Sequence, residues 1–318
     1  MTETMNYNEL ARHFADEDTA REFLENQRWP NGAACIHCGS VKVYRIEANQ
    51  AKRVRKGLYK CGDCGKQFTV TVGTIFEDSR VPLNKWLYAI HLLCSSKKGH
   101  SAHQIHRILQ VTYKTAWFMM HRIRHAMAEE PLASKLNGVV ESDETFFGGK
   151  AKNMHAKERK VKIQGRGTVN KEAVVTLVER DGRVKTTHVG HVTGANVKEV
   201  LKKHVSDEAR LMTDESTLYS GASETYADHQ TVNHKAGEYV RDEAHINTSE
   251  SVHSLMKRGV IGVYHHWSKK HLHRYLAEFD FRWNHRKVVD GVRTLEAIKG
   301  FEGKRLMYRD SSVGSKKH

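Results

Sequence analysis

The sequence lacks the long apolar runs of membrane-spanning helices. No apolar stretch in its 318 residues approaches the roughly 20 that a bilayer-crossing helix needs. Its start, Met1-Thr2-Glu3-Thr4, is polar and acidic, unlike a secretory signal. The five cysteines are too few and too clustered for a disulfide scaffold. We therefore expect no membrane partner, a reducing, cytoplasmic location, and two or three small domains, which this length allows.

The chain is also short of acidic residues relative to basic ones. It has 37 Asp and Glu against 52 Lys and Arg, which gives a net charge of +15. A charge of this size attracts polyanions, and phosphate contacts supply most non-specific binding to nucleic acids. DNA or RNA is therefore the leading partner. The competing interpretation is a basic protein whose charge only keeps it soluble.

Four of the cysteines form two CxxC pairs, Cys35 with Cys38 and Cys61 with Cys64. Each pair can supply two thiolates to one tetrahedral metal ion, and a closed set of four protein ligands is typical of a structural zinc site. The alternative is four unrelated buried cysteines. We predict a structural Zn²⁺, with His37 as a neighbour of the site rather than a ligand.

Residues 82–128 follow the apolar spacing of helices. Ser101 can cap a short helix, and a second helix follows the turn at residues 109–112, so this region predicts a helix-turn-helix. Basic side chains on the second helix could face DNA phosphates or base edges. The alternative is an ordinary pair of helices with a solvated, charged face.

The last part of the chain alternates between strand and helix patterns. Residues 138–147, 173–179 and 183–192 read as strands, and the turn Asp181-Gly182 marks the last two as a hairpin. A helix from Asn196, a strand over 209–213 and helices from about Asn247 and Ser268 follow. This order predicts an α/β domain with a mixed sheet.

Three acidic residues, Asp143, Asp214 and Glu250, give the best indication of the chemistry. Asp143 and Asp214 each end an apolar, strand-like run, and Glu250 lies in the first turn of a predicted helix. Such carboxylates can gather around a pair of divalent metal ions, which perform phosphoryl transfer on nucleic acid by in-line displacement. Alternatively, Asp143 is an exposed acid on an edge strand and Asp214 is a helix N-cap. Glu144 points to the opposite face of its strand from Asp143.

Glu250 has a structural competitor. Asn247-Thr248-Ser249-Glu250 has the spacing of a capping box, in which Asn247 is the N-cap and Glu250 reaches back to it. Capping and metal binding would then compete for one carboxylate. Asn247 could instead donate its own amide oxygen to the metal, and Lys257 and Arg258 could contact DNA phosphates.

Several segments together resemble a known family. They are Arg28-Trp29-Pro30 before the CxxC pairs, Gly73-Thr74-Ile75-Phe76, Thr115-Ala116-Trp117-Phe118, Asp143-Glu144-Thr145 with Gly148-Gly149-Lys150, and the pattern His271-Leu272, Arg274-Tyr275, Glu278-Phe279, Arg282-Trp283-Asn284 and Arg286. The chain is similar over nearly its whole length to insertion-sequence transposases of the zinc-ribbon, ISXO-like subgroup, which have a ribonuclease-H-like DDE core.

This resemblance implies cleavage of DNA at the ends of an element and strand transfer to a target, with Mg²⁺ (or Mn²⁺) at the catalytic site. It assigns catalytic, metal-binding roles to Asp143 and Asp214. Because the third position of this subgroup is also described with an Asn and a Lys, Asn247 and Lys257 stand beside Glu250. Bringing two element ends together implies a homodimer or higher oligomer on DNA.

The expected fold is therefore α/β, a ribonuclease-H-like mixed-sheet domain preceded by a zinc ribbon and a helix-turn-helix region. The expected parts are N-terminal helices over 1–30, the zinc ribbon over 31–72, the helix-turn-helix region over 73–132, the catalytic domain over 133–308 with a basic insert at 149–171, and a disordered tail over 309–318. Lys and Arg residues in the insert and in 257–287 are expected to bind DNA phosphates.

Three other classes remain open on the residues alone. A sequence-specific DNA-binding regulator would bind DNA without metal-dependent products, and a stand-alone metal-dependent nuclease would cut DNA without joining it. A zinc-ribbon protein could also bind RNA or another protein. The acidic triad favours an enzyme over a regulator, and only a joining assay separates a transposase from a nuclease.

Overall fold

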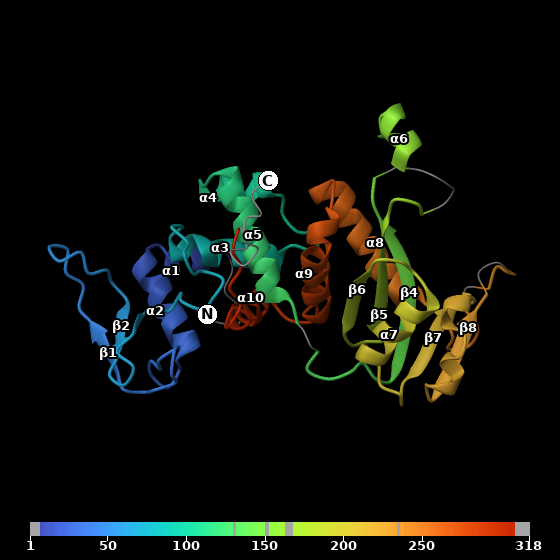
Figure 1. The fold of residues 1–318 in the computed structure, drawn as a ribbon, viewed down its shortest axis with the longest axis horizontal. Helices are drawn as coiled ribbons and strands as arrows, with labels where there is room; N and C mark the ends of the chain where they lie inside the picture. The colour runs from blue at the N-terminus through green and yellow to red at the C-terminus, as the bar shows by residue number, and fades with distance from the viewer. Residues whose placement is uncertain are drawn as a thin grey trace, which may run out of the picture. The chain divides into compact units, whose positions relative to one another are not determined.

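The computed structural model describes residues 7–129, 132–149, 153–162, 168–233, 236–238 and 240–308. Its contacts divide the chain into two compact units, which we call unit 1 (Met1–Met127 with Val288–His318) and unit 2 (Ala128–Lys287). Figure 1 shows the elements of both. No helix in the described part of the chain is both long and apolar enough to cross a membrane.

Unit 1 begins with two short helices and a small sheet. The helices are α1 (Tyr7–His13) and α2 (Glu17–Arg28), and the antiparallel strands, in the order β1-β2-β3, are β1 (Val43–Ile46), β2 (Leu58–Cys61) and β3 (Gln67–Phe68). Asp16 caps α2, since its carboxylate accepts a hydrogen bond from the backbone N–H of Thr19 at 2.8 Å. Trp29, Tyr59 and Phe68 pack together beneath the sheet, with ring centroids 5.4 to 5.8 Å apart.

Four further helices belong to unit 1. They are α3 (Leu83–Ser95), α4 (Ala102–Leu109), α5 (Tyr113–Met127) and α10 (Asp290–Lys299). Ser101 caps α4, as predicted, through its hydroxyl and the N–H of Gln104 at 3.1 Å. Gln110 then adopts the left-handed conformation (φ 51°), which ends α4 and turns the chain into α5.

The position of α10 corrects one expected boundary. The catalytic domain was expected to run to residue 308, but the contacts place Val288 onward in unit 1. The reason is a set of hydrogen bonds to α3: Thr294 bonds the ring of His91 at 3.0 Å, and Arg293 donates to the carbonyl of Cys94 at 2.7 Å. The expected disordered tail, 309–318, lies outside the described residues.

Unit 2 is built on a five-stranded mixed sheet in the order β6-β5-β4-β7-β8. The strands are β4 (Val139–Phe147), β5 (Glu172–Glu179), β6 (Val184–Val189), β7 (Arg210–Asp214) and β8 (Asp228–Val232). β4, β5 and β6 pair antiparallel, whereas β7 pairs parallel to both β4 and β8. The predicted hairpin between β5 and β6 is confirmed, and β8 falls in a stretch that looked irregular.

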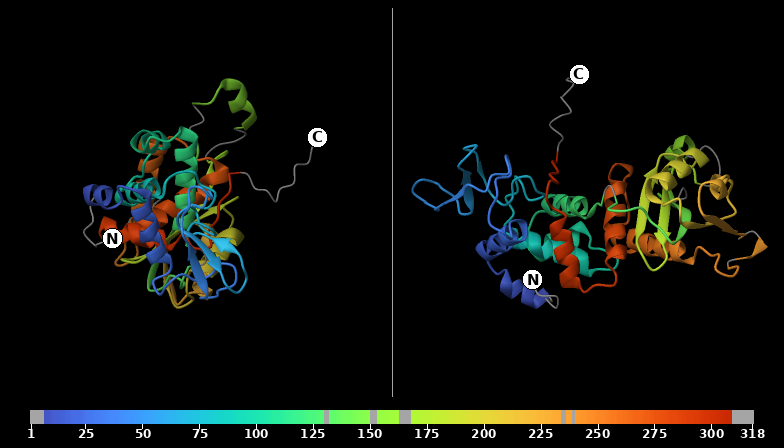
Figure 2. Two further views of the ribbon diagram at one scale, coloured as in Figure 1. Left: turned by 90° about the vertical axis from the view of Figure 1, so that its left-hand side faces the viewer. Right: turned by 90° about the horizontal axis from the view of Figure 1, so that it is seen from below.

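Helices cover both faces of this sheet, which Figure 2 shows from two further sides. These helices are α7 (Gly194–His204), α8 (Asn247–Gly259) and α9 (Leu272–Asn284). Helix α6 (Ala156–Lys162, within the expected basic insert) projects beyond the sheet (Figure 1), and short turns lie at Thr217–Tyr219, Ala222–Glu224, Val260–Tyr264 and Lys269–His271. Val175 and Leu177 of β5 pack in the core beneath α7, and Val174 and Val178 pack in the core beneath α8 and α9. This alternation is the period-2 pattern of a strand that is buried on both faces.

Helix α9 protects the open edge of the sheet at β6. Asn284 accepts a hydrogen bond from the N–H of Val184 at 2.7 Å and donates to its carbonyl at 3.3 Å. One turn earlier, Asp280 accepts from the N–H and the hydroxyl of Thr186 at 3.0 and 2.8 Å. These side chains satisfy edge groups that would otherwise be free to pair with another strand.

We predict that Asn284→Ala lowers the free energy of unfolding of unit 2 by about 1–3 kcal/mol, because it leaves both backbone groups of Val184 without this partner. Urea denaturation followed by circular dichroism measures the change. Glu199→Ala, at an exposed position of α7, is the control and should change stability by less than about 0.5 kcal/mol. Equal stability of the two variants would contradict this role for Asn284.

Candidate functional site

The two CxxC pairs meet in unit 1. Cys35 and Cys38 lie in the turn before β1, Cys61 ends β2, and Cys64 follows in the turn to β3. Gly39 and Gly65 follow the two pairs with φ of 77° and 69°, values that glycine adopts without strain. Their N–H groups close the turns onto the carbonyls of Cys35 and Cys61. The local sequence thus folds each pair into a knuckle.

The sulfur positions fit one tetrahedral ion. The distance from Sγ to Sγ is 3.7 Å between Cys35 and Cys64 and 3.6 Å between Cys38 and Cys61. A tetrahedral zinc ion with Zn–S bonds of about 2.3 Å sets its sulfurs about 3.8 Å apart. The backbone N–H groups of His37 and Cys64 donate to Cys35 and Cys61 at 3.4 Å, which favours the thiolates. The four cysteines are therefore a structural Zn²⁺ site.

The first two acids of the predicted triad lie on neighbouring strands of unit 2. Asp143 is on β4, the central strand of the sheet, so the interpretation of an exposed acid on an edge strand is wrong. The parallel register pairs Val139 with Arg210 and Glu141 with Met212. These pairs end at Glu141 and Met212, and Asp143 and Asp214 each lie two residues beyond them, at the same end of the two adjacent strands.

Both aspartates point to the same face of the sheet. Val139 of β4 packs in one apolar cluster with Met212 of β7. Side chains two residues apart on a strand share a face, so Asp143 and Asp214 lie on the face that carries this cluster. It is also the face covered by α8, since His253 of α8 reaches Asp143. Glu144 faces the other way, toward Tyr219, as expected from the alternation.

Glu144 faces the opposite side of β4 but still experiences the charges of both aspartates. The pKa of Glu144 is raised to about 7, mainly by burial; a hydrogen bond from the Tyr219 hydroxyl opposes the shift, and the negative charges of Asp143 and Asp214 add to it. Burial, followed by the charge of Glu144, raises the pKa of Tyr219 well above its ordinary value. A cluster of like charges of this kind favours a bound cation.

His253, on α8, holds Asp143 in place. Its Nδ1 lies 3.4 Å from Oδ2 of Asp143, and its Nε2 lies 2.8 Å from the hydroxyl of Thr176 on β5. The other Asp143 oxygen accepts from the N–H of Glu144 at 2.8 Å. In the neutral ring, Nδ1 can donate to Asp143 while Nε2 accepts from the Thr176 hydroxyl; the carboxylate, which can only accept, favours this tautomer.

The start of α8 differs from the predicted capping box. The helix begins at Asn247, the preceding Ile246 makes no side-chain cap, and Glu250 does not reach back. Instead, the buried carboxylate of Glu141 on β4 accepts from the N–H groups of Thr248 and Ser249 at 2.8 and 3.0 Å. Because Glu141 satisfies these donors, the carboxylate of Glu250 is left exposed to solvent.

Asp214 is not a helix N-cap either. The short turn Thr217–Tyr219 is capped by Ser216, whose hydroxyl accepts from the N–H of Leu218. Asp214 instead accepts from the N–H of Ser216 through Oδ1 at 3.0 Å. This bond holds the carboxylate at the end of β7.

The predicted zinc ligands lie close together, whereas the predicted ligands of the catalytic metal do not form such a compact group. Within the ranges described above, the four cysteines form the one group whose ligand atoms all lie within 4.8 Å of one another. Asp143 and Asp214 share a face of the sheet. Asn247, Glu250 and Lys257 are exposed along one side of α8, at i, i+3 and i+10.

Sequence reasoning missed Glu141 and His253. Glu141 lies in the same predicted strand as Asp143. Its role could not be predicted because its ion pair with Arg180 and its hydrogen bonds to α8 join segments that are far apart in the sequence. His253 lies one turn after Glu250 on the same predicted helix, but it is buried whereas Glu250 is exposed, and the spacing alone did not distinguish them.

Replacing one zinc ligand should remove the metal and unfold the ribbon. We expect Cys61→Ser to lower the zinc content from one ion per chain to near zero and to abolish the thermal transition of residues 31–72, because a site of this kind supplies much of its own folding energy. Zinc analysis after gel filtration measures the loss. Cys94→Ser, at a buried cysteine of α3 outside the cluster, should retain one zinc, and equal loss from both variants would contradict the assignment.

Comparisons with known proteins agree with this architecture. Residues 135–284, which contain the sheet and α8, match the ISXO2-like transposase domain, and residues 15–67 match the transposase zinc-ribbon domain. A protein of the transposable element ISH50 of Halobacterium salinarum is 29% identical over 278 residues, which cover 85% of this chain and 91% of that protein. The chain therefore belongs to the zinc-ribbon, ISXO2-like family of insertion-sequence transposases.

Proposed function

We propose that this transposase cleaves the ends of an insertion sequence and joins them to target DNA by two-metal phosphoryl transfer on the face of the sheet that carries Asp143 and Asp214. The observation that supports the proposal is that two aspartates lie on the same face of adjacent parallel strands, under the helix that bears Glu250.

The topology supports a ribonuclease-H-like core. Three antiparallel strands, β4, β5 and β6, are followed by α7 and by two strands, β7 and β8, that run parallel to β4. Carboxylates beside one another on β4 and β7, with a later helix over the same face, are the arrangement that the family resemblance implies. The parallel pairing is what sets the two aspartates side by side.

Asp143, Asp214 and Glu250 are the residues that would hold Mg²⁺ or Mn²⁺, because hard divalent cations prefer carboxylate oxygens. Two such metal ions, when bound, would stabilise the charge that develops at the scissile phosphate and would lower the pKa of an attacking water or 3′-hydroxyl. The protein's own contribution is orientation: His253 and the N–H of Glu144 hold the two oxygens of Asp143, and the N–H of Ser216 holds Asp214. Partners of this kind typically change metal affinity by about 10- to 100-fold.

DNA contact would come from both units. In unit 1, α4 and α5 are joined by a three-residue turn, 110–112, which supports a helix-turn-helix with α5 as the helix that enters the groove. In unit 2, Lys257 and Arg258 are exposed on α8, two turns after Glu250. Joining two element ends in one reaction requires two active sites, so we infer a homodimer or higher oligomer on DNA.

Replacing either aspartate should abolish chemistry and spare binding. We expect Asp143→Asn and Asp214→Asn to lower strand transfer on an element-end duplex by at least about 100-fold, because each removes a charged metal ligand, while the duplex Kd stays near that of the unchanged protein. Asp207→Asn, an exposed acid before β7, should transfer normally. Strand transfer by the Asp143 and Asp214 variants at a rate near that of the unchanged protein would contradict their assignment as metal ligands. Cleavage without joining by the unchanged protein would indicate a nuclease.

The third metal ligand can be identified by metal titration. We expect Glu250→Gln to raise the Mn²⁺ concentration for half-maximal transfer by about 10- to 100-fold and Asn247→Ala to raise it much less. Lys257→Gln should weaken DNA binding and lower the slope of log K against log salt by about 1. Ser254→Ala, also exposed on α8, is the control. A larger effect from Asn247→Ala than from Glu250→Gln would transfer the role to Asn247.

A further inference from the structure

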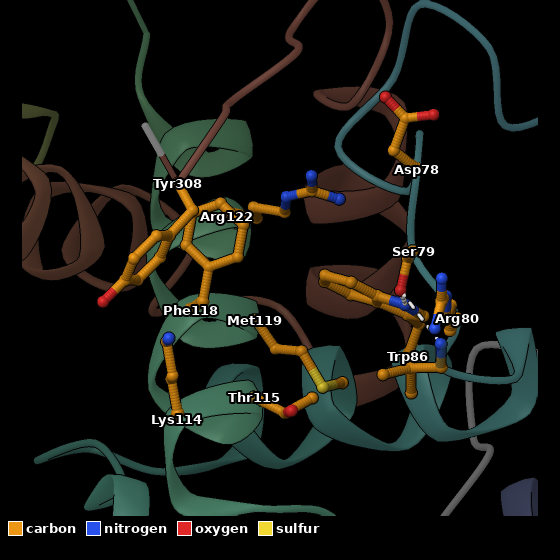
Figure 3. A pocket seen from close by; sticks show the side chains of 11 residues that line it. Asp78, Ser79, Arg80, Trp86, Lys114, Thr115, Phe118, Met119, Arg122 and Tyr308 are labelled. Atoms are coloured by element: carbon orange, nitrogen blue, oxygen red, sulfur yellow. Dashed lines mark hydrogen bonds between the residues drawn. The ribbon is translucent and has the colours of Figure 1, made fainter. Parts of the chain in front are cut away.

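A pocket of about 360 Å³ lies in unit 1 between α5 and the loop of residues 78–81. Figure 3 shows its two walls, with Lys114, Phe118 and Tyr308 on one side and Ser79, Arg80 and Trp86 on the other. The volume falls within the range of small-ligand sites. The zinc site and the acidic cluster involve none of these residues.

Aromatic rings form much of the lining. Phe118 and Tyr308 pack edge to face, with centroids 5.4 Å apart, and Tyr308 remains 52% exposed. Across the pocket, Trp86 is 1% exposed and its indole N–H donates to Ser79 at 3.1 Å, so it closes the back of the pocket without an unmet donor. A flat, aromatic group is the ligand that such walls fit.

The polar part of the lining carries positive charge. Lys114 and Arg80 are exposed at the rim, and the Lys114 ammonium sits 4.7 Å from the centroid of the Tyr308 ring. Arg122 adds a fixed charge, because its guanidinium donates to three backbone carbonyls, those of Ile75, Glu77 and Leu306. Asp78 also lines the pocket, but its carboxylate is paired with Arg305 at 2.6 Å. The site therefore favours an anion that carries an aromatic ring.

We propose that this pocket binds one unpaired nucleotide of DNA, with its base against Tyr308 and Phe118 and its phosphate near Lys114 and Arg80. The inference rests on the proposed function, in which α5 contacts DNA, because Lys114 and Phe118 belong to that helix. A paired base stays in the duplex stack, so only a nucleotide at an overhang or an opened end can enter. The pocket would thus distinguish processed or opened element ends from intact duplex.

The test compares one element-end duplex with blunt ends and the same duplex with a short single-stranded overhang that contains 2-aminopurine, both bound to the full-length protein. We expect the overhang to bind more tightly by about 5- to 100-fold, the range for stacking of one base, and its fluorescence to be quenched on binding. Tyr308→Ala and Lys114→Gln should lower this preference to near one, and Tyr308→Ala should also relieve the quench.

Tyr113→Ala is the matched control, since Tyr113 is a 45% exposed tyrosine of the same helix that does not line the pocket. It should keep the preference and the quench. Equal binding of the two DNAs by the unchanged protein, or a preference that survives Tyr308→Ala, would overturn the pocket assignment while strand transfer by the unchanged protein still upheld the proposed function. Absence of binding to either DNA would overturn both.

Discussion

The acidic site depends on one buried carboxylate, that of Glu141. Its side chain is 0% exposed and forms an ion pair with Arg180, at 2.8 Å. The same carboxylate accepts from two backbone N–H groups and one hydroxyl at the start of α8, 107 residues further along the chain. A negative charge at a helix N-terminus is favoured by the helix dipole, whereas a buried charge that loses its partner costs about 3–5 kcal/mol. Glu141 thus fixes where α8 begins above β4.

This placement of α8 has two consequences for the chemistry. The helix directs His253 inward onto Asp143, and it leaves Glu250 and Lys257 exposed, available for the metal and DNA contacts that we propose. The parallel pairing of β4 with β7 adds Asp214 on the same face. The charge of Glu141 is therefore neutralised by Arg180 and the start of α8, whereas Asp143 and Asp214 lie on the face of the sheet where we propose that the metal ions bind.

Several parts of this arrangement could be predicted from the sequence, because each depends on residues that are close together along the chain. The cysteine spacing predicted the zinc site, and the apolar runs before Asp143 and Asp214 predicted their strands. Glu141 and His253 could not be assigned in this way, because their partners depend on which strands and helices meet in space. The residues from Asn247 to Glu250 have the spacing of a capping box, but in the structure Glu141 accepts hydrogen bonds at the start of the helix instead. Likewise, nothing in the pattern of α10 indicated that it packs on α3.

The most direct test of the account is the position of Mn²⁺ in crystals of the full-length protein, located by its anomalous scattering. The account predicts a peak bound by carboxylate oxygens of both Asp143 and Asp214, with Glu250 or Asn247 moved inward to complete the site and Glu141 still bonded to the start of α8. A peak that contacts only one aspartate, or none, would contradict the claim that the two strands and α8 build one catalytic metal site.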